Sequence, residues 1–194
     1  MKKAEIILGA ISIISLILNL FLVPGTEEIY VFSSLFLSAF YLYFSFALFN
    51  GVKYRQLMKK IAYKGIGIMR VLSAVTTGSA ISMIILGVLF NYQIWSGGNE
   101  LAFLGVVILS LILVISVIKY FTSKATFYIV TIKRAVIYLC FAVLTLTLPK
   151  FALLEFKYRN HPDYIEAFKN VVNDDTGNKE LREKLKEERR KIDE

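Results

Sequence analysis

Charged residues are missing from the interior of the long apolar runs that fill the first three quarters of the chain. Between Met1 and Pro149, acidic and basic residues fall at the ends of apolar segments or in connectors. An isolated charge at bilayer depth is unfavourable, and unpaired backbone polar groups cannot be left in lipid. The pattern favours a polytopic helical membrane protein and predicts no buried ionic chemistry between its helices.

Residues that bind metals or act as nucleophiles are also scarce, since the chain has one cysteine and one histidine. Cys140 has no disulfide or metal-ligand partner, so we interpret it as a small buried apolar residue. His161 precedes Pro162 in what looks like a helix start. There is no phosphate loop, nucleophile elbow or paired intramembrane aspartate. The sequence therefore predicts no catalytic residue, metal site or cofactor.

Long apolar segments are abundant instead. Hydrophobic residues make up 56% of the chain, above the roughly 45–50% of an ordinary soluble domain. Four apolar segments are long enough to span a membrane, and a fifth lies between Ala125 and Leu148. The fifth carries Lys133 and Arg134 in its first half, so we interpret residues 121–132 as an interfacial turn that precedes it. We expect an all-α bundle of two hairpins plus one helix over 1–149, with spans of suitable length at about 6–23, 29–49, 71–95, 101–118 and 135–149.

Basic residues accumulate in alternate connectors, which predicts the orientation because Lys and Arg favour the cytoplasmic side. The other two connectors carry only acids, and residues 1–149 hold the whole formal charge of +8. We expect a cytoplasmic N terminus and a C-terminal tail on the opposite side of the membrane; an even number of spans would return the tail to the cytoplasm. The residues expected to set this topology are Lys53, Arg55, Lys59, Lys60, Lys64, Arg70, Lys119, Lys124, Lys133 and Arg134.

The positions of these bases also bear on the partners. They flank the expected spans, where orientation and anionic lipid headgroups account for them. We therefore expect the lipid bilayer, and no nucleic acid, as their partner.

Small residues line one face of the third expected span. Ala74, Gly78 and Ser82 repeat at every fourth position, and small residues let helix backbones approach closely in lipid. This face predicts a helix at the centre of the bundle. A polar transport path is the alternative for the hydroxyls nearby, which are those of Ser73, Thr76, Thr77, Ser79 and Ser82.

The turns that close the two expected hairpins resemble each other. Residues 22–28, with Pro24 and Gly25, can be laid over residues 94–100, with Gly97 and Gly98. Either an internal duplication or the common chemistry of helix ends explains the match.

A family resemblance lies in the second hairpin. Gly78 is followed by the segment Ile-Ile-Leu-Gly-Val-Leu-Phe, which includes Gly87, then by Trp-Ser-Gly-Gly at 95–98 and by Gly105. This pattern over residues 78–105 resembles the membrane hairpin of the GldL family, the gliding-motility and type 9 secretion motor subunit of Bacteroidetes, and related uncharacterised Bacteroidetes membrane proteins. The resemblance implies a hairpin shape and a bacterial lineage, and hence an inner-membrane protein with a periplasmic tail. We also expect Gly87 and Gly105 to pack helices.

The same resemblance implies an ion-driven motor with an intramembrane glutamate a few residues after the returning glycine. Leu109 occupies that position here, and no carboxylate replaces it in the fourth segment. Without a group that binds and releases a proton, coupling to an ion gradient has no chemical basis there.

Residues 150–194 differ in character and predict a charged, amphipathic helical tail. Helices are expected from Pro162 and from Lys179, with apolar positions spaced at helical intervals. The tail either forms a small hairpin, docks on a partner, or remains a solvated end. The residues expected to contact a partner are Tyr164, Phe168, Val172, Leu181 and Leu185.

These features together favour a non-enzymatic membrane subunit or scaffold that packs with another membrane protein or with a second copy of itself. The alternatives are a transporter, channel or ion-driven motor subunit, and a membrane enzyme acting on lipid headgroups near Glu27, Glu28 or His161.

Overall fold

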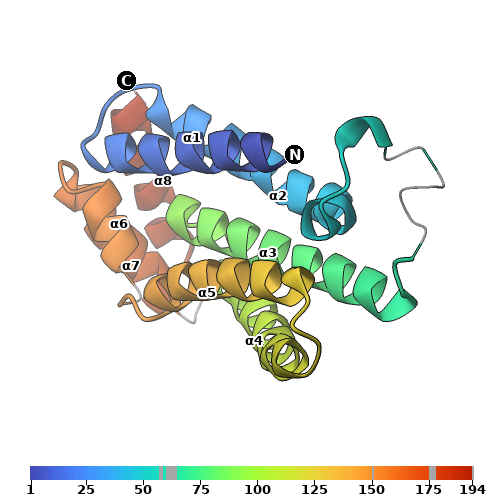
Figure 1. Cartoon of the computed structure of the whole chain (residues 1–194). Helices are drawn as coiled ribbons and strands as arrows, with labels where there is room; N and C mark the ends of the chain where they lie inside the picture. Colours follow the sequence, from blue (N-terminus) through green and yellow to red (C-terminus); the bar gives the residue numbers. More distant parts are fainter. Residues whose placement is uncertain (57–58, 60–64, 150, 175–177, 194) are drawn as a thin grey trace. The chain divides into compact units, whose positions relative to one another are not determined.

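The computed structural model describes residues 1–56, 59, 65–149, 151–174 and 178–193. Within these residues every regular element is helical (Figure 1). The chain divides into two compact units, Met1–Thr147 and Leu148–Glu194.

The first unit contains five helices that are long and apolar enough to cross a membrane. The expected all-α fold with five candidate spans is thereby confirmed. A short 3₁₀ helix, Tyr54–Gln56, lies in the connector between the second and third. The five helices are α1 (Lys2–Leu20), α2 (Thr26–Asn50), α3 (Ile68–Gln93), α4 (Gly98–Ser123) and α5 (Thr126–Leu146).

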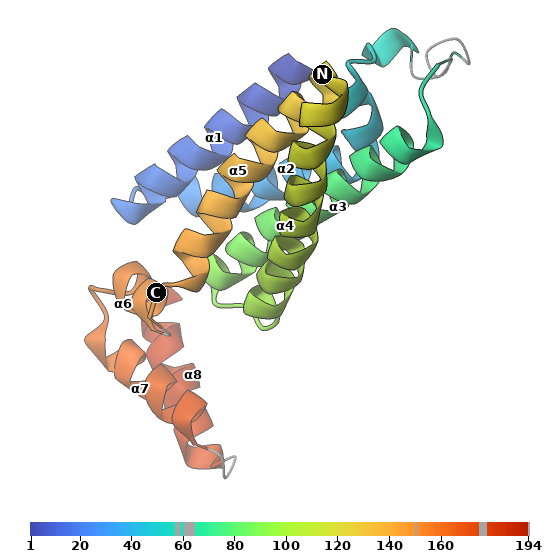
Figure 2. The ribbon, with the colours of Figure 1, turned by 60° about the horizontal axis from the view of Figure 1, so that its bottom comes forward.

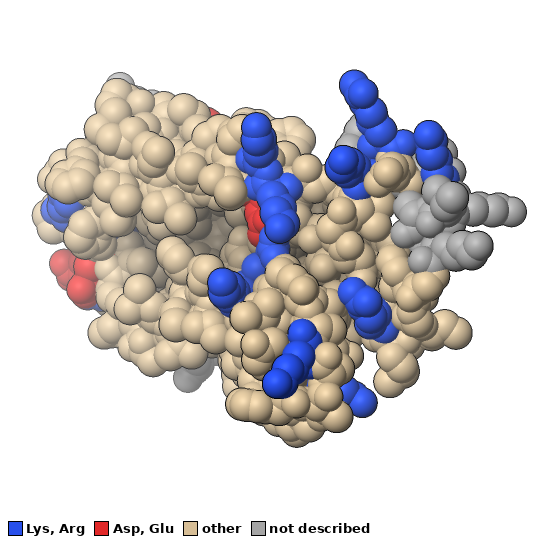
Figure 3. All heavy atoms as spheres, in the orientation of Figure 1, with Lys and Arg blue, Asp and Glu red and all other residues tan. Residues whose placement is uncertain are grey.

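Helix α3 lies at the centre of this unit, in contact with α2, α4 and α5, whereas α1 packs mainly on α2 (Figure 2). We call the end of the bundle that holds Met1, the described connector residues 51–56 and 65–67, and Lys124 the basic end. The end that holds the turns 21–25 and 94–97 is called the turn end. On the face seen in Figure 3, Lys and Arg side chains gather at the basic end, and the surface toward the turn end is mostly uncharged.

The boundary predicted for the fifth span is wrong. No interfacial turn occupies residues 121–132, because α4 continues to Ser123 and α5 begins at Thr126 after Lys124, whose φ is +49°. Helix α5 then runs through Lys133 and Arg134 and ends at Leu146, before the expected end at 149. The charges do not interrupt the helix, because Lys133 is exposed and Arg134 has an acidic partner on α1.

The small residues predicted to pack helices are all buried. They comprise Ala74, Gly78, Ser82, Gly87 and Gly105. A Cβ atom on Gly78 would collide with Ser45 and the Tyr41 carbonyl of α2. These positions therefore set the close spacing between α3 and its neighbours.

The two hairpin turns have the same backbone conformation. Leu22 and Ile94 each have a φ of +58°, and Gly25 and Gly97 have φ values of +77° and +83° at the N-caps of α2 and α4. In both turns a backbone amide donates to the carbonyl five residues earlier, the hydrogen bond of a Schellman motif. Pro24 lies within the first turn, and Gly98 begins α4 against Asn91, where a Cβ would not fit.

The packing of the hairpins matches as well. Ser12 of α1 donates a hydrogen bond of 2.9 Å to Ser33 of α2. At the same offset as the turns, Ile84 of α3 lies against Gly105 of α4. One register therefore relates both the turns and the contacts between the arms, which supports a duplicated hairpin over coincident turn chemistry.

The second unit contains three helices, α6 (Ala152–Lys157), α7 (Pro162–Asn173) and α8 (Lys179–Asp193). His161 and Pro162 begin α7 as the sequence predicts. Helices α7 and α8 contact each other, so the tail forms a helical hairpin. Tyr164 is buried against Tyr158 and Phe168, with ring centroids 4.6 and 6.2 Å away.

The close approach at Gly78 predicts opposite effects for one substitution at two glycines. Replacing Gly by Ala inside a helix normally adds about 1 kcal/mol of helix propensity. Gly78→Ala should nevertheless lower the free energy of unfolding, by about 1–3 kcal/mol, because the methyl group overpacks the contact with α2.

Gly9→Ala is the matched control, because a Cβ there meets nothing within 4 Å. Thermal unfolding in mild detergent, followed by circular dichroism, compares the two variants. Equal stability of both would contradict the packing role of Gly78.

Candidate functional site

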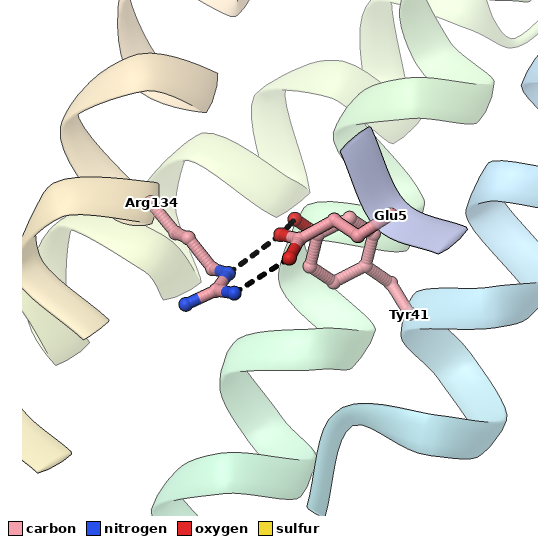
Figure 4. A network of polar contacts seen from close by, with 3 residues as sticks. All are labelled: Glu5, Tyr41 and Arg134. Atoms are coloured by element: carbon pink, nitrogen blue, oxygen red, sulfur yellow. Dashed lines mark hydrogen bonds and ion pairs between the residues drawn. The ribbon is translucent and has the colours of Figure 1, made fainter. Parts of the chain in front are cut away.

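An ion pair lies inside the bundle, near its basic end. The Arg134 Nε and Nη2 atoms of α5 each donate a hydrogen bond of 2.6 Å to the Glu5 carboxylate of α1 (Figure 4). Both side chains are only 14% exposed. This two-pronged geometry is the strongest arrangement available to an arginine and a carboxylate.

Aromatic side chains surround the pair. The hydroxyl group of Tyr41 on α2 donates a hydrogen bond to Glu5, and the ring of Tyr138 meets the Tyr41 ring edge-on at 5.3 Å. The Arg134 guanidinium lies over the ring of Phe49, 5.2 Å from its centroid. The site thus joins α1, α2 and α5, and both carboxylate oxygens of Glu5 are hydrogen-bonded.

This pair corrects the expectation that the helices enclose no ionic chemistry. Arg134 was predicted only to set topology, and Glu5 was treated as the charged end of a segment. The available signal was that the first segment carries one acid near its start and the fifth carries a base within it. An arginine inside a span requires a partner, and Glu5 supplies it.

A cleft of about 120 Å³ lies on the turn side of the ion pair, between α1 and α5. Gly9 and Ile13 form one wall and Ile137 and Phe141 the other, while α2 and α3 supply the floor. The lining is almost entirely apolar. The ion pair of the site therefore lies at its basic end, and the cleft offers mainly hydrocarbon contacts.

Hydroxyl groups elsewhere in the bundle are used to join helices. Ser38 of α2 and Ser82 of α3 lie 2.7 Å apart, within hydrogen-bond distance, and Tyr92 of α3 donates to Asn19 of α1. Thr77 bonds to the Ser73 carbonyl of its own helix at 2.5 Å. Of the hydroxyls considered for a transport path, those of Thr77 and Ser82 are thus hydrogen-bonded, and Thr76 is exposed.

The other predicted residues fall in several places. Arg70 lies over the ring of Phe127, 5.0 Å from its centroid, while Lys60 and Lys64 lie outside the described residues. Cys140 is exposed on α5, so its expected burial is wrong: it lies on the outward face of that helix. The remaining topology residues are exposed, namely Lys53, Arg55, Lys59, Lys119, Lys124 and Lys133.

The predicted contact residues of the tail also differ in exposure. Tyr164 is buried within the second unit, whereas Val172 is 40% exposed. Phe168, Leu181 and Leu185 are half-buried. Of the predicted set, Val172 thus offers the most surface to a partner.

Comparison of the chain with protein families, curated proteins and solved structures found no match. The resemblance over 78–105 therefore stays a prediction, and the site is interpreted from its own geometry.

The buried pair predicts a large effect when one partner is removed. Glu5→Gln leaves the Arg134 charge enclosed without a counterion and should lower the free energy of unfolding by about 3–5 kcal/mol. The double variant Glu5→Leu with Arg134→Met should recover most of this loss, because neither charge remains.

Unfolding in mild detergent measures both variants, with Glu28→Gln as the control because Glu28 is exposed. If Glu5→Gln behaves like the control, the pair does not hold α1 and α5 together.

Proposed function

We propose that this chain is a non-enzymatic integral membrane subunit, in which the bundle is the anchor and the second unit binds another membrane protein. The observation that carries the proposal is that the tail has buried residues of its own, Leu154, Tyr164 and Ala167. A solvated, fraying end lacks such a core. Phe156 and Val172 remain 45% and 40% exposed on this unit.

The arrangement of charge supports an orientation with the N terminus in the cytoplasm, and the resemblance over 78–105 supports a bacterial inner membrane as the location. Lys53, Arg55 and Lys124 lie at the basic end, and Glu28 and Glu100 lie at the turn end. This asymmetry follows the preference of basic loops for the cytoplasmic side. Five spans then carry the chain out, so the tail lies in the periplasm.

Thiol labelling tests this topology. In a Cys140→Ala background, Lys186→Cys should react with an impermeant maleimide in intact spheroplasts, because its position on α8 is exposed and periplasmic. Arg55→Cys, at the basic end, should react only after the membrane is opened. Labelling with the reverse pattern would place the tail in the cytoplasm.

Partner binding is tested by isolating the tagged chain from its native membranes in mild detergent. A partner, or a second copy, should elute in a fixed ratio with the unaltered chain. Val172→Glu should reduce the recovered partner roughly tenfold, because a charge in the centre of an apolar contact is strongly unfavourable.

Asn170→Glu is the control, because it places the same charge at an exposed position of the same helix. A clean monomer from native membranes, or equal losses in the two variants, would contradict the proposal.

A second candidate, a transport or ion-driven motor subunit, is favoured by the Glu5 carboxylate. This chain lacks the intramembrane glutamate that the motor family has. The matching position is Leu109, which is apolar and fully buried. Glu5 is a carboxylate in another helix, but both of its oxygens are hydrogen-bonded to Arg134. An ion that bound Glu5 would have to displace Arg134. Ion flux in proteoliposomes that disappears in Glu5→Gln would favour this candidate.

A further inference from the structure

The cleft between α1 and α5 opens to the side of the bundle. Of its wall residues, Ile13 is 44% and Ile137 is 56% exposed. Figure 3 faces this side, where the surface is hollowed and blue side chains border the hollow. The volume of about 120 Å³ is close to the ~150 Å³ of an engineered apolar cavity that admits benzene. The cleft is thus wide enough for a hydrocarbon chain.

The lining excludes a polar occupant. Ser12, whose side chain belongs to the α1 part of the lining, already donates a hydrogen bond to Ser33. A buried water needs two to four polar partners, and the aliphatic and aromatic walls provide few. In a bilayer, the molecule of matching chemistry that surrounds the cleft is a lipid acyl chain.

Both walls of the cleft lead to an exposed lysine at the basic end. Lys133, Ile137 and Phe141 follow one another at steps of four residues along α5, so they share one face of the helix. On α1, Lys2 precedes Gly9 by two helical turns and lies on the same face. A lipid whose acyl chain lies in the cleft therefore has its headgroup between these lysines.

These two lysines carry the uncompensated charge of the site. Glu5 and Arg134 neutralise each other, which leaves neither as the partner of an anion. In the described part of the chain, neither Lys2 nor Lys133 forms an ion pair. A phosphodiester headgroup with a net negative charge complements them, and a zwitterionic headgroup does so less well.

From this placement we propose that the α1–α5 cleft binds one anionic phospholipid, with an acyl chain against Ile13, Ile137 and Phe141 and its phosphate at Lys133 and Lys2. This site is independent of the proposed protein partner of the tail. It gives the bundle a lipid specificity that apolar helices alone do not confer.

Native mass spectrometry of the full chain, titrated with palmitoyl-oleoyl phosphatidylglycerol or with phosphatidylcholine of the same chains, tests the proposal. One phosphatidylglycerol should bind more tightly than phosphatidylcholine. Lys133→Gln should weaken phosphatidylglycerol binding about fivefold, the effect of one lysine near an anionic surface. It should leave phosphatidylcholine binding unchanged. Ile137→Trp should weaken both lipids, because the indole fills the cleft.

Matched variants on α4 serve as controls, since Lys119 and Ile118 are exposed away from the cleft. Lys119→Gln and Ile118→Trp should leave both affinities unchanged. The proposal would be overturned if the two lipids bound equally well, or if Lys119→Gln weakened phosphatidylglycerol binding as much as Lys133→Gln does. Either result would mean that the basic end attracts anionic lipids without a specific site. A second copy of the chain bound in place of lipid, released by Ile137→Trp, would overturn it as well.

Discussion

The ion pair between Glu5 and Arg134 is the constraint on which the arrangement of the bundle depends. Helix α1 packs mainly on α2, and in the proposed membrane its apolar surface gains little by leaving lipid for another helix. The pair gives α1 a directional attachment to α5, at a point where both side chains are largely buried. It joins the first and last helices of the unit and leaves the cleft open beside it.

Close packing and polar contacts both join neighbouring helices, and the contact between α2 and α3 uses both. Gly78 and Gly105 bring α3 close to α2 and α4 without specific bonds, whereas Ser12 with Ser33 and Ser38 with Ser82 supply hydrogen bonds between neighbours. The second hairpin repeats the backbone of the first. Where the first has the hydrogen bond between Ser12 and Ser33, the second has the Ile84 side chain packed against Gly105. One backbone plan thus serves both a polar and an apolar interface.

Local patterns in the sequence were sufficient for the helices and turns, and insufficient for the site. Apolar length located the five helices, and the glycines at 25 and 97 located the turns, because these features depend on residues close in sequence. The Glu5–Arg134 pair joins residues 129 apart in the sequence, and no local sequence pattern predicts such a contact. The error at the start of α5 has the same origin, since Arg134 was judged without its partner. The cleft exists because α1 and α5 do not pack closely along their length. The sequence does not predict this gap, because it depends on how all five helices pack together.

The separation of 129 residues between the two charges has a consequence for biosynthesis. At ribosomal rates of about 5–20 residues per second, Arg134 emerges roughly 6 to 26 s after Glu5. In the membrane location proposed above, the nascent first helix carries an unpaired carboxylate throughout that interval, which is unfavourable at bilayer depth. This end of the helix would then stay near the headgroups or against protein until the fifth helix arrives. The first segment translated would be among the last to reach its final depth.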